Sequence, residues 1–152
     1  MTVLLAAQGL AVAPPRGWDV RIYRRPPQGP EATYAVLHAG TFALPSSRGD
    51  YGDGAVQLMG PGDAFVALVE FDPASAGQAL FAGRGFPAPP VADDFSRTSL
   101  QVSIAGHGGA QQWFTEADRP WCLYVVIGDW ANRGRLAALA GRLVTAIEVQ
   151  AR

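Results

Sequence analysis

Alternating apolar and polar residues predict the strands of this chain. Residues 18–24 (WDVRIYR) alternate with a period of two, which is typical of a strand with one face in water. Residues 64–71 (AFVALVEF) are almost all apolar and predict a central strand with both faces buried. Two short strands are expected at residues 3–7 and 11–13, joined by a Gln-Gly turn. One further strand is expected over residues 34–38 and 41–44, with a kink or bulge at Gly40.

The second half of the chain predicts a meander and a terminal helix. Residues 100–104, 111–116 and 121–127 are apolar or alternating runs separated by turn residues, which predicts three neighbouring antiparallel strands. Apolar residues recur at steps of three and four from Leu136 to Ile147. A helix with one apolar face on the sheet is therefore expected there.

Short helices are expected in two of the connections. Residues 55–59 predict one, with Asp53 as its N-cap, and residues 72–81 predict a helical turn. Together these elements predict the α+β class: an antiparallel sheet with the C-terminal helix packed across it and short helices in the connections. At 152 residues the chain is expected to form a single domain, 1–152, around one core.

Composition and charge narrow the range of partners. Apolar residues make up 49% of the chain and charged residues 16%, below the usual value of about 25%, so the chain can bury a sizeable core. The net charge is −1 and the pI is near 6.1, so no strong positive field would attract nucleic acid or an anionic membrane. No segment approaches the roughly 18 consecutive apolar residues of a membrane span.

The first residues do not predict a secretory signal. No positive residue precedes Arg16, and the Gln8-Gly9 pair interrupts the apolar run. A signal peptide has a basic start and an unbroken apolar core of about 7–15 residues. We therefore expect a cytoplasmic protein.

Residues with catalytic or metal-binding chemistry are few. His38 is expected in the core and His107 at an exposed glycine turn, and neither has a second metal-ligand type two to four residues away. The single cysteine, Cys122, lies in an apolar run and excludes an internal disulfide. A hydrolase would need one histidine placed near Ser103 or Cys122 and near Asp118. The sequence therefore identifies no catalytic residue, no metal site and no cofactor, and leaves a hydrolase as an alternative.

All twelve basic residues are arginine. Coding by a GC-rich genome explains this bias, and selection of arginine for bidentate anion recognition is the functional alternative. In that alternative, arginines converge on a pocket for a small molecule or anion. The candidate ligand-binding residues are Arg48, Arg84, Arg97 and Arg119. The segment 48–54 lacks the lysine and spacing of a P-loop, so turn and capping chemistry explains its glycines and aspartates.

Aromatic residues concentrate near the predicted meander. The candidates for an interaction surface are Trp113, Phe114, Trp121 and Trp130. Neighbouring strand residues point to opposite faces, so Trp113 and Phe114 cannot both be buried by one helix layer. One of them is expected on the second face, where exposed aromatic residues favour binding.

The layout is similar to that of a known fold. A short hairpin leads to the turn Pro15-Arg16-Gly17-Trp18, and the chain finishes with a meander and a helix. This order resembles the Mog/PsbP-like fold, and FALP (42–45) and CLYVV (122–126) resemble segments of small uncharacterised proteins of high-GC, actinobacterial-type bacteria. The resemblance implies a non-catalytic role, such as binding a small GTPase, stabilising a photosynthetic complex or serving as a secreted lipoprotein domain. The secreted members carry a signal peptide and a lipobox, and this sequence shows neither.

Three functions stand as hypotheses. The first is a non-enzymatic protein-interaction or assembly module that binds an unknown protein partner or forms a homodimer, and it predicts an exposed apolar patch. The second is a domain that binds a small molecule or an anion through arginines. The third is a small hydrolase-type enzyme that uses His38 or His107. Neither nucleic acid nor a membrane is expected among the partners.

Overall fold

The computed structural model describes residues 3–151, which form two antiparallel sheets. The smaller sheet has the order β1-β2-β8, with β1 at Leu5–Ala7, β2 at Leu10–Val12 and β8 at Ile147–Val149. The larger has the order β3-β4-β5-β7-β6, with β3 at Asp19–Arg24, β4 at Ala35–Gly40, β5 at Ala64–Glu70, β6 at Gly108–Glu116 and β7 at Arg119–Ile127. The helix α1 spans Arg133–Val144. The predicted α+β class is confirmed.

Five short 3-10 turns lie in the connections. They are η1 (Val56–Leu58), η2 (Pro73–Ser75), η3 (Ala79–Phe81), η4 (Ala92–Asp94) and η5 (Trp130–Asn132). The helical turn predicted at 72–81 is present as η2 and η3, and the side chain of Asp72 caps the first of them by accepting from the Ala74 N–H at 2.9 Å. Within residues 3–151, no helix has the length and apolar character needed to span a membrane.

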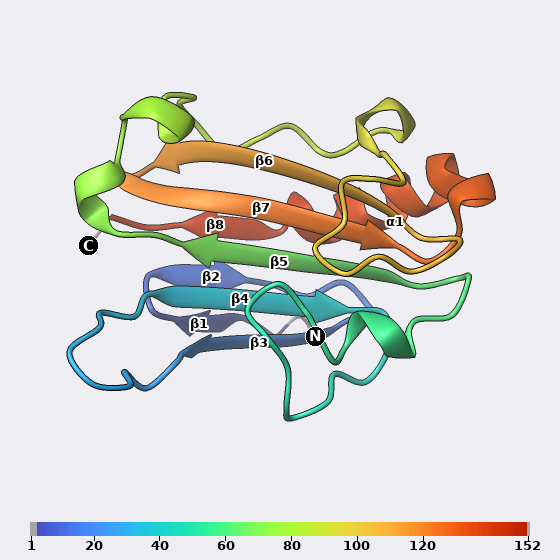
Figure 1. Ribbon diagram of the computed structural model, residues 1–152, viewed down its shortest axis with the longest axis horizontal. Coiled ribbons are helices and arrows are strands. Elements are labelled where there is room, and N and C mark those ends of the chain that lie inside the picture. The colour runs from blue at the N-terminus through green and yellow to red at the C-terminus, as the bar shows by residue number, and fades with distance from the viewer. Residues whose placement is uncertain (1–2, 152) are drawn as a thin grey trace.

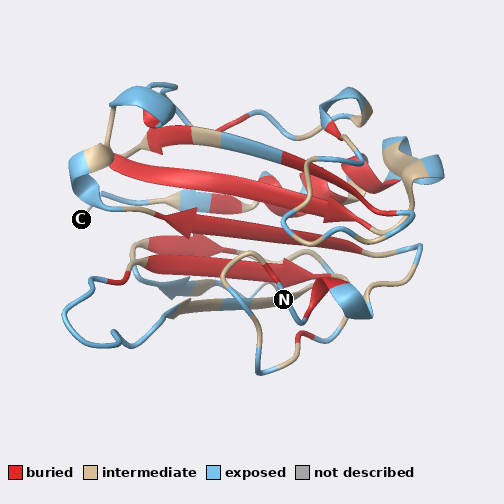
Figure 2. Cartoon of the chain, in the orientation of Figure 1, coloured by how far each residue is buried: buried red, intermediate tan, exposed pale blue. Residues whose placement is uncertain are grey.

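The larger sheet forms the middle layer of the molecule. Figure 1 looks onto this sheet, with α1 and the smaller sheet behind it and loops in front. Apolar side chains of α1, β2 and β8 pack against its rear face. Loop residues such as Leu44, Val56 and Leu100 pack against its front face. The strands β4, β5 and β7 are therefore buried along their whole length, as Figure 2 shows.

Strand alternation divides the apolar residues of β5 between two cores. The side chains that face the rear core are Ala64, Val66 and Leu68. Those that face the front core are Phe65, Ala67 and Val69. A strand with one solvent-exposed face would carry polar residues at every second position, and β5 has no polar residue before Glu70. The prediction of a strand buried on both faces is confirmed.

The predicted strand at 100–104 is wrong, although its alternation is real. Leu100, Val102 and Ile104 do pack together against the front core, but from a loop that lies over the sheet. The Gln101 N–H donates to the Tyr124 hydroxyl at 2.7 Å, which fixes the loop across the sheet face. Ser96 pairs with Gly109 at the start of β6, and residues 100–104 lie over the sheet face rather than beside its edge.

Three smaller predictions also fail. The segment 41–44 is irregular because Thr41 turns toward Asp63 and donates to its carboxylate at 2.9 Å. The helix ends at Val144, and Ile147 lies in β8, where it pairs with β2 and still fills the rear core. Asp53 does not cap the turn at 55–59, because its carboxylate accepts from the Gln57 side chain at 2.6 Å.

A buried ion pair within the larger sheet lies where this sheet meets the smaller one. Arg119 at the start of β7 donates from Nε to Glu70 Oε2 at 2.8 Å and from Nη2 to Glu70 Oε1 at 3.1 Å, and both side chains are 4% exposed or less. The remaining N–H groups of Arg119 donate to three carbonyl oxygens, those of Gln8, Gly9 and Gln150, at 2.9–3.2 Å. All five donors of the guanidinium are thus satisfied.

These carbonyls belong to the two ends of the chain, so one side chain holds both ends against the large sheet. Gly9 lies in the β1–β2 turn with φ +75°, and a Cβ at this position would collide with Arg119 Nη1. The hairpin therefore needs glycine here for both backbone conformation and close approach. The Gln150 N–H donates to the Gly9 carbonyl at 2.9 Å and closes the same junction.

Substitution of Arg119 by Met is expected to lower the free energy of unfolding by about 3 to 5 kcal/mol, because the buried carboxylate of Glu70 loses the guanidinium that balances its charge. Chemical denaturation measures the loss. The matched control is Arg21→Met, which breaks the exposed pair with Asp19 and should cost less than about 1 kcal/mol. Equal effects of the two substitutions would contradict a structural role for the buried pair.

Candidate functional site

Three aromatic rings meet on the front face of the molecule. Phe71 directly follows β5, Phe81 ends η3, and Trp113 points forward from β6. Their centroids lie 5.3 Å apart for Phe71–Phe81, 5.3 Å for Phe71–Trp113 and 5.7 Å for Phe81–Trp113. Phe81 is buried, whereas Phe71 and Trp113 are half-buried. We call these three residues the aromatic patch.

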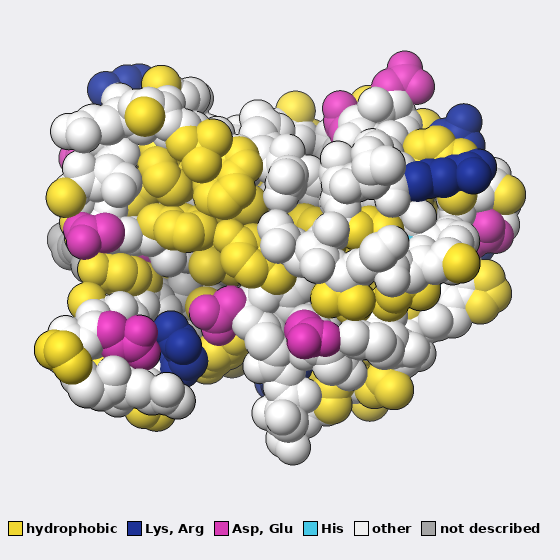
Figure 3. Space-filling view, in the orientation of Figure 1, with side chains coloured by type: hydrophobic (Ala, Val, Ile, Leu, Met, Phe, Trp, Pro, Cys, Tyr) yellow, Lys and Arg dark blue, Asp and Glu magenta, His cyan; other side chains and the backbone are white. Residues whose placement is uncertain are grey.

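The patch lies in a broader hydrophobic area of the front face. Figure 3 shows hydrophobic side chains gathered at the left of the view, over the ends of β5 and β6 and the start of β7. Rings in tilted and edge-to-face contact support one another, so the patch presents a rigid apolar surface. Exposed apolar surface of this kind marks sites of contact with other molecules.

A hollow of about 200 Å³ opens beside the patch. Its walls include Tyr34, Tyr51 and Phe71, so Phe71 belongs to both the hollow and the patch. Its charged lining residues are Arg25, Asp50 and Glu70, of which Glu70 is buried and paired with Arg119. An apolar wall with a few polar groups is the usual make-up of a binding site.

The predicted aromatic surface residues lie in three different places. Only Trp113 belongs to the patch. Phe114 and Trp121 are 1% and 0% exposed in the rear core, so their prediction as surface residues is wrong. Alternation explains the difference, since Phe114 faces the opposite side from Trp113. Trp130 is half-buried with the guanidinium groups of Arg97 and Arg133 over its ring at 5.1 and 4.5 Å.

Phe71 and Phe81 were not among the predicted site residues. The sequence could have placed Phe71 on the front face. Phe65, Ala67 and Val69 face the front, and Phe71 follows at the same two-residue spacing. Phe81 has no such signal. Its position depends on the path of the chain after β5, where Thr115 Oγ1 donates to the Phe81 carbonyl at 2.7 Å across 34 residues of sequence.

A second polar cluster surrounds His38 on β4. The ring is fully buried, its Nε2 donates to the Asp50 carbonyl at 2.7 Å, and its Nδ1 accepts from Arg48 Nε at 2.7 Å. The rings of Tyr23 and Phe65 lie against it at 5.3 and 5.2 Å. Both ring nitrogens are therefore satisfied, as expected of a core histidine.

Burial sets the protonation state of this cluster. Desolvation, with a smaller contribution from the Arg48 charge, lowers the pKa of His38 to about 4, so the ring is neutral near pH 7. The Tyr23 hydroxyl donates to Asp50 Oδ1 at 2.9 Å, and burial together with this hydrogen bond raises the Tyr23 pKa. The cluster fastens the loop of residues 45–54 to the sheet. It presents no free base.

The four candidate arginines have separate surroundings. Arg48 bonds to His38 and to the Pro45 carbonyl, and Arg119 bonds to Glu70 and to three carbonyls. Arg97 lies over Trp130, and Arg84 is exposed at an isolated bridge to Thr115. The contacts in residues 3–151 connect none of the four with another. Arg119 was expected to bind a ligand, yet its five donors are all used within the protein.

The residues of the hydrolase alternative are also separated. His107 is 6% exposed, so the expectation of an exposed turn is wrong, and its Nδ1 has no hydrogen-bond partner among the described residues. Burial lowers the pKa of His107 and raises the pKa of the Cys122 thiol to about 12. Within residues 3–151, neither histidine forms a hydrogen bond to Ser103, Cys122 or Asp118.

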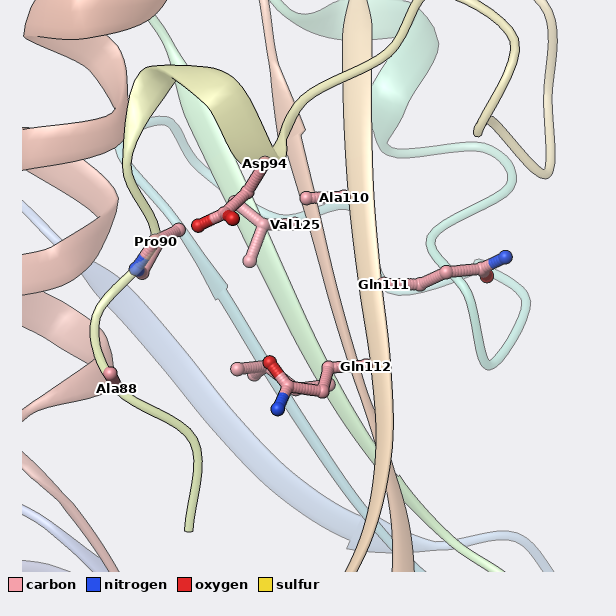
Figure 4. A pocket seen from close by; sticks show the side chains of 8 residues that line it. Ala88, Pro90, Asp94, Ala110, Gln111, Gln112 and Val125 are labelled. Atoms are coloured by element: carbon pink, nitrogen blue, oxygen red, sulfur yellow. The ribbon is translucent and has the colours of Figure 1, made fainter. Parts of the chain in front are cut away.

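A smaller cavity of about 110 Å³ lies behind β6. Figure 4 shows the carboxylate of Asp94 and the carboxamide of Gln112 pointing toward it, while Gln111 points away. Its apolar walls include Ala110 and Val125. The Asp94 carboxylate also accepts from the Val91 N–H at 2.8 Å, which fixes its position at the mouth.

Likeness to other proteins adds no residue to these sites. The chain matches no protein-family model, no curated protein and no solved structure. Within residues 3–151, no three His, Cys, Asp or Glu side chains gather as a set of metal ligands. The candidate binding sites are therefore the aromatic patch, the hollow beside it and the cavity behind β6.

The free energy of unfolding is expected to fall as the pH drops from 7 to 4. The unfolded chain takes up a proton at His38 near pH 6.5, whereas the folded chain keeps this ring neutral down to about pH 4. The stability that neutral His38 contributes is complete above pH 6.5 and is lost toward pH 4, by about 3 kcal/mol. Urea denaturation at a series of pH values measures this slope.

His38→Gln is the variant that isolates this effect, because glutamine keeps a donor and an acceptor but does not titrate. Its stability should depend less on pH than that of the wild type over the same range. His107→Gln controls for the second buried histidine. A His38→Gln variant with the wild-type slope would show that another group causes the loss.

Proposed function

We propose that the chain is a non-enzymatic protein-interaction module that binds its partner through the aromatic patch. The observation that carries this proposal is the meeting of Phe71, Phe81 and Trp113, from three separate segments, on one face. Large, rigid aromatic rings provide much of the binding energy at protein interfaces. Phe71 and Trp113 keep part of their surface in water, and a partner would cover it.

The hollow beside the patch would make partner binding specific. A side chain of the partner could enter between Tyr34 and Tyr51, next to the opposite charges of Arg25 and Asp50. The same cavity supports a second candidate function, binding of a small molecule that has an apolar body. Its volume of about 200 Å³ is smaller than a typical drug-sized site of about 300–1,000 Å³, so a side chain is the better match.

The bonding of the polar residues favours binding over catalysis. A neutral His38 with both nitrogens bonded has no lone pair left to accept a substrate proton. All donors of Arg119 bind Glu70 or carbonyls near the two chain ends, and the other candidate arginines have separate contacts. Little therefore supports the hypothesis that these arginines bind one anion together.

The resemblance to the Mog/PsbP-like fold fits the same proposal, since the roles it implies are non-catalytic. We extend the proposal to a cytoplasmic protein whose partner is another protein rather than nucleic acid, because the net charge of −1 offers no attraction to phosphates. A homodimer through the patch is the alternative form of the same function.

Trp113→Thr and Phe71→Ser are each expected to weaken partner binding at least about tenfold, as the loss of a central aromatic residue does. Affinity capture from lysate of the source organism identifies the partner, and titration calorimetry with the purified partner measures the change. The matched control is Leu58→Ser, which removes an apolar side chain that is 60% exposed. Leu58 precedes the start of β5, about a strand length from Phe71, so its variant should bind as the wild type does.

Sedimentation equilibrium distinguishes a partner from a second copy of the chain. A wild-type dimer that both patch variants convert to a monomer assigns the patch to self-association. Patch variants that fold and bind the captured partner with wild-type affinity would refute the proposal, as would a loss of affinity in Leu58→Ser equal to theirs.

A further inference from the structure

Among residues 3–151, backbone pairing covers the outer edge of β6 only near its two ends. Near the start of the strand, Ser96 and Gly109 exchange two backbone hydrogen bonds of 2.9 and 2.8 Å. Near its end, the Thr115 N–H donates to the Gly83 carbonyl at 2.7 Å, and the Thr115 carbonyl accepts from the Gly85 N–H at 3.0 Å. The chain between these two contacts, residues 86–95, leaves the edge and runs along the rear of the molecule, where Pro89 lies against α1.

The middle of this edge therefore presents free backbone groups. The register between β6 and β7 has no bulge from Gly108 to Glu116, so every second residue of β6 points its N–H and C=O outward. Gly109 and Thr115 belong to that set, and Gln111 and Trp113 lie between them. No backbone hydrogen bond from another segment of residues 3–151 reaches Gln111 or Trp113 on this side. Figure 2 shows the middle of β6 as exposed.

The two faces of this open stretch differ in chemistry. On the front face, Trp113 joins the aromatic patch. On the rear face lies the cavity of about 110 Å³, where Asp94 and Gln112 point inward (Figure 4). A strand added to this edge would direct its alternate side chains toward these two sites.

We propose that the edge of β6 between Ala110 and Phe114 binds an extended segment of the partner protein as an added strand. Apolar side chains of the segment cover the aromatic patch, and a Lys or Arg side chain enters the rear cavity toward Asp94. This inference rests on the proposed function and names the form of its partner. Main-chain hydrogen bonds supply the affinity, and the two side-chain sites supply the specificity.

The charge of the rear cavity selects a basic residue. Asp94 Oδ2 accepts from the Val91 N–H, and Oδ1 receives no hydrogen bond from the described residues. Asp94 is the one charged group in the lining, and the Gln112 carboxamide can accept a further bond. A side chain with an apolar stem and a positive end matches a cavity that has apolar walls at Ala110 and Val125 and a carboxylate at its mouth.

A second copy of the chain does not fit this edge. The open stretch covers five residues, about 17 Å of strand, and is closed at both ends by the segments at 83–85 and 96. The nine-residue β6 of another copy, with its own covering segments, would collide with them. A short extended peptide can enter and leave the edge between the two closures.

Selection from a random heptapeptide library displayed on phage, with the intact protein as bait, tests the proposal. We expect selected peptides to combine apolar residues at alternate positions with a Lys or Arg between them. A synthetic peptide of the selected sequence should protect the Gln111 and Trp113 amides from hydrogen exchange. Selection of no such peptide, or binding without protection of these two amides, would overturn the proposal.

Two matched pairs of variants then locate the binding. Gln111→Pro removes an outward N–H without breaking the β7 ladder, so it should weaken binding of the peptide at least about tenfold. Gln111→Ala keeps this N–H and should change the affinity less than about threefold. Asp94→Asn should weaken the binding of peptides that contain Lys or Arg about threefold. Asp93→Asn should leave their affinity unchanged. The same peptide N-methylated at its edge-facing residues should not bind, which tests strand pairing without any change to the protein.

The outcomes separate this inference from the function on which it depends. If Trp113→Thr weakens the partner while Gln111→Pro and the N-methylated peptide bind normally, the patch binds and the added strand is refuted. If neither Trp113→Thr nor Gln111→Pro affects the partner, the proposed function itself fails. Loss of binding in both, with Gln111→Ala intact, is the result we expect.

Discussion

The arrangement of the two sheets depends on Arg119, which pairs with Glu70 inside the larger sheet and binds carbonyls at the edge of the smaller one. Their side chains lie in the interior, where an unpaired charge would be costly, and five hydrogen bonds satisfy the guanidinium. Three of these bonds reach carbonyls at the two ends of the chain. The smaller sheet is thereby held against the larger one at a fixed position, which completes the rear core and leaves the front face to the loops.

The front face then decides what the protein can do. Its loops are fixed by internal hydrogen bonds, such as those that His38 accepts from Arg48 and donates to the Asp50 carbonyl. The polar residues with possible catalytic or anion-binding chemistry are thus used to hold the fold. What remains available is apolar: Phe71, Phe81 and Trp113 beside an edge strand whose middle is unpaired. A surface of rings and free backbone groups favours recognition of another chain over reaction with a substrate.

Sequence patterns predicted the local elements and missed the long-range contacts. Alternation located β3, apolar runs located β4, β5 and β7, and the two-residue repeat of a strand placed Trp113 and Phe114 on opposite faces. The same alternation at 100–104 was misleading, since a loop lying over a sheet buries every second residue just as a strand does. The pairing of Glu70 with Arg119 joins residues 49 apart, and no local pattern distinguishes Arg119 from the exposed arginines. The aromatic patch likewise depends on how three distant segments meet.

If Arg119 holds the two sheets together, the small sheet and the large sheet unfold as one cooperative unit. Native-state hydrogen exchange at low denaturant measures this directly, through the amides of Val12 in β2, Gln150 after β8 and Val66 in β5. We predict that all three exchange through the same global opening, with free energies that agree within about 1 kcal/mol. Exchange of Val12 and Gln150 through a separate opening at much lower free energy, with Val66 still protected, would contradict the account.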